Sequence, residues 1–431
     1  MPDLQTKRPF VSAAQLEAIC ARFPTPFYLY SEAEIRRRAR AFNAAFAWNP
    51  GFREYFAVKA TPTPAILKVL GQEGCGCDCA TGVELSLAQA CGFGGNKVVF
   101  SSNDTPAADY RQADAMGALI NLDSADMVAC LCEALGGRMP ERVCLRVNPG
   151  QDIPGENGII GTPRDAKFGM TVPQLLQAAR DLRDLGVREF GLHAFLASNT
   201  QGEGYYPLLA RTLFSLAVRL RDELGVRVTF VDLSGGIGVA YRPEDRPVDI
   251  AAIGEGVHTA FDEVLAPAGM TDVRVGSELG RWMLAPAGAL VTRVIHEKVT
   301  YKDYLGVDAC AADLMRPAIY DAYHHITVVG REDEPAAGTY NVVGRLCENN
   351  DQFAHDRPLP RVGVGDLLWI HDSGAHGRSM GYNYNGALRP AELMLREDGT
   401  VERIRRAETP ADYFATLDED PDPAVAALAQ R

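Results

Sequence analysis

The sequence predicts a (β/α)8 barrel followed by a mainly antiparallel β domain. Over the first two-thirds of the 431 residues, eight short β-rich runs alternate with amphipathic helical stretches. Serial alternation of this kind, with buried strands, is typical of a closed parallel barrel. After Pro286 the pattern changes to alternating strands with few helices, which favours antiparallel pairing. We therefore expect a barrel domain over residues 31–280 and a β domain formed by residues 1–30 and 281–431.

Apolar runs and helix-start signals place the individual elements. The expected barrel strands lie at residues 53–58, 76–80, 97–101, 117–122, 142–147, 189–195, 228–234 and 273–279. Helices are expected before the first strand and between strands, at residues 31–47, 62–72, 82–92, 124–136, 171–185 and 205–223. In the β domain, strands are expected within residues 290–299, 324–330, 340–346 and 366–371.

Composition and charge exclude several classes of protein. Hydrophobic residues make up 47% of the chain and charged residues 23%, which is enough to bury a large core. Lys and Arg number 43 against 56 Asp and Glu, so the net charge is −13, and no basic cluster indicates nucleic-acid binding. No apolar run approaches the ~18 residues of a membrane span, and the first ten residues lack the apolar core of a secretory signal. We expect a cytoplasmic protein without a nucleic-acid or membrane partner.

Ten cysteines are dispersed along the chain, several of them within apolar runs, which is typical of free thiols and not of a disulfide framework. Cys75, Cys77 and Cys79 alternate along an expected strand. They have no CxxC or histidine partner at the spacing of a zinc site, so we predict no metal site.

Barrel enzymes carry their active sites at the C-terminal ends of the strands, so polar residues that close an apolar strand are the first candidates. Lys59 closes the apolar run that begins at Phe56, and Thr61-Pro62 follow it. A lysine in this place either extends from a strand end into solvent or is an amine of lowered pKa that forms a Schiff base with an aldehyde cofactor.

Further strand ends supply groups that suit one cofactor. Asp78 closes the second strand, Gly235 and Gly236 follow the seventh, and Glu278 closes the eighth. Glycines after a strand let backbone amides approach a phosphate, and a carboxylate keeps a pyridine nitrogen protonated. At one face of a barrel, these groups together with Lys59 predict a site for pyridoxal 5'-phosphate.

The residues lie in motifs that resemble those of the alanine-racemase-fold (fold-type III) pyridoxal phosphate decarboxylases, and among them the diaminopimelate decarboxylases. The resemblance covers almost the whole chain, and it implies the same barrel and β domain that the sequence pattern predicts. The motifs are Tyr55-Phe56-Ala57-Val58-Lys59, Asp78 with Glu84, Lys167-Phe168-Gly169, Gly235-Gly236-Ile237-Gly238, Glu278-Leu279-Gly280-Arg281, Arg316-Pro317 with Tyr320, Cys347-Glu348, and Tyr384-Asn385.

The resemblance implies roles for these residues. Lys59 would hold the cofactor as an internal aldimine, and Glu278 would keep the ring protonated so that it stabilises the quinonoid carbanion left by loss of CO2. Cys347 of the partner subunit would protonate that carbanion, which makes a homodimer with shared active sites obligatory. Without the resemblance, Cys347 would be interpreted as a buried structural thiol. The other cofactor-binding residues implied are Asp78, Phe195, Ser198, Gly235, Gly236, Gly280, Arg281 and Tyr384.

The resemblance also implies a substrate. Arg281, Arg316 and Tyr320 resemble the clamp of the diaminopimelate enzymes for the distal end of the substrate, and two guanidinium groups suit a carboxylate bidentately. Glu348 would receive the distal ammonium, and His376 would stand near the substrate. The expected reaction is decarboxylation of meso-diaminopimelate to L-lysine and CO2, a step of lysine biosynthesis.

Three positions depart from the family pattern and leave other substrates open. Phe195 replaces a histidine that stacks on the cofactor ring, Ser234 replaces the first of three glycines near the phosphate, and His376 replaces a tyrosine near the substrate. Phe195 can stack but cannot hydrogen-bond. D-Ornithine, D-lysine or a related diamino acid is the second candidate substrate, because diaminopimelate is itself attacked at its D centre. The third hypothesis is a catalytically inactive homologue that binds pyridoxal phosphate, and the retained catalytic residues speak against it.

Overall fold

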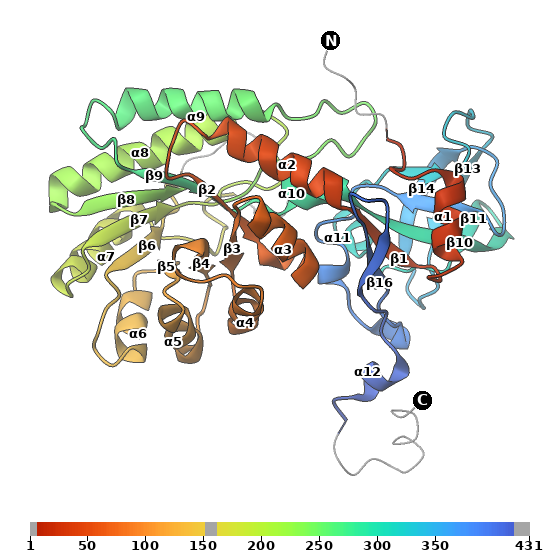
Figure 1. Ribbon diagram of the computed structural model, residues 1–431, viewed down its shortest axis with the longest axis horizontal. Helices are drawn as coiled ribbons and strands as arrows, with labels where there is room; N and C mark the ends of the chain where they lie inside the picture. Colours follow the sequence, from red (N-terminus) through yellow and green to blue (C-terminus); the bar gives the residue numbers. More distant parts are fainter. Residues whose placement is uncertain (1–6, 151–161, 418–431) are drawn as a thin grey trace. The chain divides into compact units, whose positions relative to one another are not determined.

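The computed structural model describes residues 7–150 and 162–417, which group into two compact units (Figure 1). Each unit is assembled from segments that are separated in the sequence. The barrel unit comprises Arg36–Val239 and Pro247–Met283, and the β unit comprises Met1–Ile35, Ala240–Arg246 and Leu284–Arg431.

The barrel unit contains a closed sheet of eight parallel strands in chain order, and the pairing of β2 with β9 closes it. The predicted barrel is confirmed, and every strand lies within two residues of its expected bounds. The strands are β2 (Arg53–Ala57), β3 (Gly76–Cys79), β4 (Val98–Ser101), β5 (Leu119–Leu122), β6 (Arg142–Arg146), β7 (Glu189–His193), β8 (Arg227–Asp232) and β9 (Arg274–Ser277). Because all eight strands are parallel, their C-terminal ends meet at one edge of the barrel.

Helices follow the strands and bury one apolar face each. The helix α7 shows the pattern: Thr171 and Gln174 form a capping box at its N-terminus, and Leu175 and Leu182 are among the buried side chains. Burial of each such leucine contributes about 1.5–3 kcal/mol. The helices are α2 (Glu32–Ala45), α3 (Pro64–Gln72), α4 (Gly82–Ala90), α5 (Ala107–Ala115), α6 (Met127–Ala134), α7 (Val172–Asp184), α8 (Tyr205–Leu224), α9 (Ile250–Val264) and α10 (Arg281–Leu284).

The β unit is built around a mixed, mostly antiparallel sheet with the order β14-β13-β11-β10-β1-β16-β17, and β15 pairs with β10 and β12. Among the described strands of this unit, only β1 with β16 and β11 with β13 pair in parallel. The strands are β1 (Phe27–Ser31), β10 (Gly288–Val299), β11 (Asp303–Val307), β12 (Ile326–Val328), β13 (Gly338–Val343), β14 (Gln352–Leu359), β15 (Leu367–Ile370), β16 (Ala391–Leu395) and β17 (Val401–Arg405). The helices are α1 (Ala13–Cys20), α11 (Arg316–Tyr320) and α12 (Pro410–Phe414).

The core of the β unit joins the first residues of the chain to its last strands. Leu16 of α1, Phe27 of β1, Trp369 of β15 and Leu393 of β16 belong to one buried apolar cluster. This packing explains why a strand near the N-terminus belongs to the same sheet as strands near the C-terminus, although the whole barrel sequence separates them.

Two general expectations can be compared with the described residues. All ten cysteines are free, as predicted. None of the helices within residues 7–150 and 162–417 has both the length and the apolar character that crossing a bilayer requires.

Candidate functional site

Lys59 follows the first barrel strand in a turn that keeps its side chain out of the core. β2 ends at Ala57, and the 3₁₀ turn Val58–Ala60 follows it. Val58 and Ala60 are buried, whereas the Lys59 side chain between them is 54% exposed. Lys59 Nζ donates a hydrogen bond to Asp78 Oδ2 at 3.0 Å. The amine therefore lies beside a carboxylate at the C-terminal edge of the barrel strands, and not in packed hydrocarbon.

Asp78 is a buried carboxyl group in β3, and its second oxygen, Oδ1, has no hydrogen-bond partner among the described residues. Burial raises the pKa of Asp78 to about 7, the charge of Glu278 adds to that increase, and Lys59 opposes it. Burial lowers the pKa of Lys59, but Asp78 and Glu278 outweigh burial, so the net pKa of the amine is raised. The lowered amine pKa expected from the sequence is wrong, because two carboxylates neighbour the amine.

Glu278 follows β9 and has three side-chain hydrogen-bond partners. Ser101 Oγ donates to Oε1 at 2.9 Å, while Ser234 Oγ at 3.0 Å and His193 Nε2 at 2.9 Å contact Oε2. Burial by itself raises the pKa of Glu278, but His193, Lys59 and Ser101 together lower it to about 2. Glu278 is therefore ionised at neutral pH, and an ionised carboxylate accepts a hydrogen bond from a protonated pyridine nitrogen.

Two other carboxyl groups near Glu278 have raised pKa values. Asp232 ends β8, Glu54 lies in β2, and both are fully buried. Burial raises the pKa of each well above its ordinary value, and the charge of Glu278 contributes to both increases. When the environments of neighbouring carboxyl groups shift their pKa values in opposite directions, the group with the lowest pKa is the one that ionises first. Glu278 therefore carries the negative charge.

His193, Asp232 and Glu278 bring three potential metal ligands within 4.8 Å of one another. The contact between His193 and Glu278 accounts for this closeness without an ion. Burial raises the pKa of Asp232, and a metal ligand must be deprotonated, so this shift disfavours metal binding. We therefore assign these three residues to the hydrogen-bond network around Glu278.

Gly235 and Gly236 follow β8, where backbone segments approach closely. A Cβ on Gly235 would lie 2.8 Å from the Glu278 carbonyl oxygen, and one on Gly236 would lie 2.7 Å from the Ala197 carbonyl oxygen. Gly236 also has a φ of +111°, which glycine adopts without strain. Both glycines are therefore required for this turn to pack beside Glu278.

The other barrel-unit residues predicted for the site follow β7 and β9 at the same edge. Phe195 and Ser198 follow β7 and are half-buried. The Phe195 ring lies 3.5 Å from the position of a Cβ on Gly235, so it borders the glycine turn. Gly280 precedes α10, and Arg281 begins that helix with a buried side chain.

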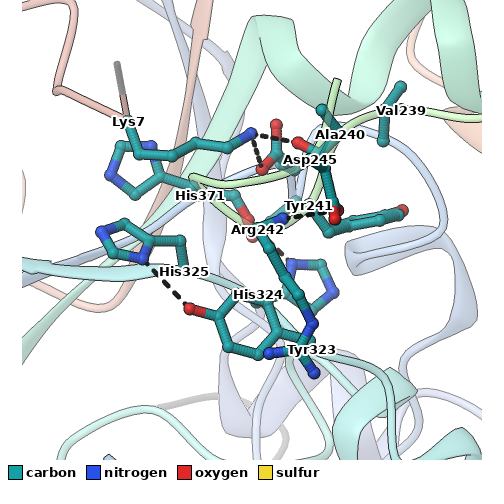
Figure 2. A network of polar contacts seen from close by, with 12 residues as sticks. Lys7, Val239, Ala240, Tyr241, Arg242, Asp245, Tyr323, His324, His325 and His371 are labelled. Atoms are coloured by element: carbon teal, nitrogen blue, oxygen red, sulfur yellow. Dashed lines mark hydrogen bonds and ion pairs between the residues drawn. The ribbon is translucent and has the colours of Figure 1, made fainter. Parts of the chain in front are cut away.

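In the β unit, Arg316 is a buried guanidinium held by two aromatic side chains. Its Nη1 donates to Tyr241 Oη and contacts His324 Nε2, each at 2.9 Å. Figure 2 shows Tyr241 and His324 close together, and their ring centroids are 5.2 Å apart. Because a guanidinium only donates, His324 Nε2 is an acceptor, and Nδ1 donates to the His371 carbonyl oxygen at 2.7 Å. His324 is therefore neutral, and Arg316 is restrained.

The segment Ala240–Arg246, which carries Tyr241, is fastened within the β unit by the rest of the network in Figure 2. Lys7 forms a buried ion pair with Asp372 at 2.7 Å and donates to the Ala240 carbonyl oxygen. The guanidinium carbon of Arg242 lies 4.1 Å from the ring centroid of Tyr323. These contacts on both sides of Tyr241 hold its hydroxyl against Arg316.

Cys347 lies in an exposed loop whose backbone is anchored. Cys347 N donates to Asn385 Oδ1, and Leu346 N donates to Asp351 Oδ2, each at 2.7 Å. A Cβ on Gly344 would lie 2.4 Å from the Asp351 carboxylate, so this anchor requires glycine. The thiol is free and exposed, which contradicts the interpretation of Cys347 as a buried structural thiol.

The remaining predicted residues also belong to the β unit. Tyr320, Glu348 and Tyr384 are exposed, and His376 is half-buried with a φ of +55°. The structure thus gathers Lys59, Asp78, Glu278 and the glycine turn at one edge of the barrel. The predicted residue Arg281 also belongs to the barrel unit, whereas the β unit carries Arg316, Tyr320, Cys347, Glu348, His376 and Tyr384.

Several residues of the site escaped the sequence prediction. Ser101, His193 and Asp232 are the last residues of β4, β7 and β8, so the strand-end criterion that found Asp78 could have found them. Tyr241 gave no comparable signal, because it follows the glycine turn in a segment without regular structure.

Comparison with known proteins shows the family to which the chain belongs. Residues 32–285 match the family model for the pyridoxal binding domain of pyridoxal-dependent decarboxylases. The chain is 38% identical to Protein TabA of Pseudomonas amygdali pv. tabaci over 94% of each chain. It is 36% identical to the diaminopimelate decarboxylase of Pseudomonas fluorescens, over 94% of this chain and 96% of that one. The crystal structure of diaminopimelate decarboxylase from M. jannaschii with L-lysine is similar, with a TM-score of 0.86, 28% identity and 95% of each chain covered.

The barrel-unit residues suit the cofactor of these relatives. An exposed amine is available at Lys59, the buried Asp78 Oδ1 lacks a protein partner among the described residues, and Glu278 is ionised. The aldehyde of the cofactor requires the amine, and a ring substituent that donates a hydrogen bond suits Asp78 Oδ1. A protonated ring nitrogen requires the ionised Glu278.

We predict that Lys59→Ala abolishes both turnover and the visible absorbance of the purified protein, because the amine that holds the aldehyde is lost. Lys68→Ala, which removes an exposed lysine of α3, is the matched control and keeps both properties. Absorption spectra and CO2 release measure the outcome. Retained turnover in Lys59→Ala would show that another amine holds the cofactor.

We predict that Asp78→Asn makes the stability of the cofactor-free protein less dependent on pH. The folded-state pKa of Asp78, about 7, exceeds its ordinary value of 3.8, so the folded state binds a proton that the unfolded state releases. Stability from this group is therefore present at low pH and is lost as the pH rises towards 7. Asp232 and Glu54 act in the same direction, so the dependence becomes weaker without vanishing.

Urea denaturation midpoints measured from pH 5 to pH 8 test the Asp78 prediction. Asp303→Asn, at an exposed aspartate, is the control and should follow the wild-type curve. An Asp78→Asn curve parallel to that of the wild type would contradict the assignment of a raised pKa to this carboxyl group.

Proposed function

Since the chain belongs to the pyridoxal-dependent decarboxylase family, we propose that it converts meso-diaminopimelate to L-lysine and CO2. Membership of that family makes the chain a pyridoxal phosphate-dependent amino-acid decarboxylase. The observation that supports the finer assignment is the buried and restrained guanidinium of Arg316, since a preoriented guanidinium suits a second carboxylate on the substrate.

When bound, pyridoxal phosphate supplies an aldehyde that combines with amines and a ring that absorbs the electron pair left by CO2. Lys59 would hold the aldehyde, and Gly235, Gly236 and Tyr384 would hold the phosphate. Phe195 borders the glycine turn, and both Phe195 and Ser198 lie in the loop after β7, where they would contact the ring and its substituents.

Asp78 would accept the proton that Lys59 loses when its amine combines with the aldehyde, and return it when the substrate amine displaces Lys59. A lysine attacks as a neutral amine, so its ammonium proton must leave Nζ. Asp78 Oδ2 lies 3.0 Å from Nζ, and its pKa of about 7 lets it accept that proton and return it near neutral pH.

Glu278 holds a proton at the ring nitrogen. Its pKa is lowered to about 2, whereas burial raises the pKa values of the neighbouring carboxyls of Asp232 and Glu54, so Glu278 is the most acidic of the three. A carboxylate in this place favours decarboxylation because a protonated ring is a stronger electron sink.

The residues that bind the far end of the substrate would determine which amino acid the protein accepts. Arg281 and Arg316 would bind the distal carboxylate, with Tyr320 and His376 beside it, and Glu348 would receive the distal ammonium. The restraint of Arg316 by Tyr241 and His324 reduces the conformational freedom lost on binding.

Cys347 would act as the acid that protonates the substrate carbon after CO2 has left, and it would do so in the active site of the partner subunit. Its thiol is exposed, and its loop is anchored through Asn385 and Asp351, so the position of the thiol does not depend on burial in its own unit. This role makes a homodimer the active form.

A D-diamino acid such as D-ornithine or D-lysine is the second candidate substrate, and His376 is the observation that favours it. An imidazole replaces the phenol expected near the distal end of the substrate, which changes both the size and the hydrogen bonding of the pocket.

We predict that the protein releases CO2 from meso-diaminopimelate faster than from D-lysine or D-ornithine. Arg316→Lys should lower kcat/KM for meso-diaminopimelate by about 100-fold, because the bidentate contact is lost, and should affect D-lysine far less. D-Lysine is the internal control, since it has no distal carboxylate. Faster turnover of D-lysine by the wild type would favour the second candidate, and equal losses on both substrates would contradict the carboxylate clamp.

We predict that two inactive variants complement each other if the sites are shared. Cys347→Ala alone should lose about 10²–10⁴-fold in kcat. Coexpression with Lys59→Ala yields mixed dimers in which one site has both an intact Lys59 and an intact Cys347, so about a quarter of wild-type activity returns. Coexpression of Lys59→Ala with the Lys59→Ala/Cys347→Ala double variant is the control and restores nothing. Absence of recovery in the first mixture would contradict a thiol supplied by the partner.

A further inference from the structure

Ser234 follows β8 with its backbone in the left-handed region, at φ +53°, and is buried. Glycine adopts this conformation freely, whereas a Cβ destabilises it. The adjoining residues Gly235 and Gly236 satisfy the conformational demands of the turn with glycine, but Ser234 does not. A serine in such a position indicates that its side chain has a use that offsets the strain.

Three backbone hydrogen bonds hold Ser234 in place. Its N donates to Asp232 Oδ1 at 2.7 Å, and its carbonyl oxygen accepts from Glu278 N at 2.7 Å and from Tyr206 Oη at 2.5 Å. A glycine would make all three. These three hydrogen bonds explain the shape of the turn, but they do not explain why the residue is a serine with a hydroxyl group.

The hydroxyl of Ser234 makes one hydrogen bond to a charged partner: Oγ donates to Glu278 Oε2 at 3.0 Å. His193 contacts the same oxygen, and Ser101 donates to the other one. Ser101 in turn accepts a hydrogen bond from Asn121 Nδ2 at 3.3 Å. An ionised carboxylate offers about four acceptor positions. Three protein contacts therefore leave capacity for one further donor.

We propose that Ser234 is a positioning residue whose hydroxyl keeps Glu278 ionised and in one orientation, so that the pyridine nitrogen of the cofactor retains its proton. The inference rests on the proposed role of Glu278 and extends it to a residue at which the family's motif has glycine.

The direction of the effect follows from where a shared proton resides. A proton between a ring nitrogen and a carboxylate stays on the more basic of the two groups. Each hydrogen bond donated to the carboxylate stabilises its charged form and makes it less basic. The low pKa of Glu278 agrees with this direction. Loss of the hydroxyl should move the proton from the nitrogen towards Glu278.

Two substitutions separate the hydroxyl from the backbone strain. Ser234→Gly removes the hydroxyl and relieves the left-handed backbone, so its thermal midpoint should equal or exceed that of the wild type. Ser234→Ala removes the hydroxyl but keeps the Cβ, so its midpoint should fall. Ser215→Ala, at an exposed position of α8, is the control and should leave all properties unchanged.

The decisive readout is the 15N NMR shift of the ring nitrogen in protein loaded with 15N-labelled pyridoxal phosphate. Both Ser234 variants should move this signal towards the value of an unprotonated pyridine and lower kcat about tenfold, with a KM within about twofold of wild type. A merely structural role would instead make each property follow the thermal midpoint, so that Ser234→Gly would match the wild type.

A Ser234→Gly protein with the wild-type nitrogen shift and wild-type kcat would overturn this inference alone. A wild-type protein whose bound ring nitrogen is unprotonated would overturn the proposed role of Glu278 and this inference with it. Displaced nitrogen signals and lowered kcat in both variants, with a midpoint that falls in Ser234→Ala but not in Ser234→Gly, would support the proposal.

Discussion

The placement of charge around the Lys59 amine is the constraint on which the barrel unit depends. The amine contacts Asp78, whose pKa burial raises to about 7, while Glu278 remains ionised because donors surround it. Leaving a buried carboxylate charged is costly unless hydrogen bonds compensate for lost solvation. The contacts from Ser101, Ser234 and His193 supply that compensation at one carboxylate. Burial raises the pKa values of the neighbouring carboxyls Asp232 and Glu54, so these donors distinguish Glu278 from them.

The β unit contains a buried cation, Arg316, that also needs hydrogen-bond partners. Arg316 is almost fully buried, and the neutral ring of His324 and the hydroxyl of Tyr241 accept its hydrogen bonds. Because His324 also donates to a backbone carbonyl oxygen, its tautomer is fixed and it cannot take a second proton without losing Arg316. The segment that supplies Tyr241 comes from between two barrel elements and is fastened by Lys7 near the start of the chain. Residues distant in the sequence thus restrain one guanidinium.

The sequence was sufficient for the barrel and for the residues at the ends of its strands. Alternation of apolar runs and helices determines the fold class, and parallel strands place Lys59, Asp78 and Glu278 at one edge. The sequence could not predict which carboxyl groups are ionised, because the pKa of a carboxyl group depends on its burial and on hydrogen-bond donors from other strands. It also gave no reason to place the Ser234 hydroxyl on Glu278, since that contact depends on a left-handed backbone at one residue.

The central claim, that the amine of Lys59 holds the cofactor covalently, is tested most directly by reduction of the native protein with sodium borohydride followed by peptide mass spectrometry. The account predicts that the peptide containing Lys59 carries a phosphopyridoxyl group and that prior addition of substrate lowers the yield of that labelled peptide. A phosphopyridoxyl group on a different lysine, with Lys59 unmodified, would contradict the account.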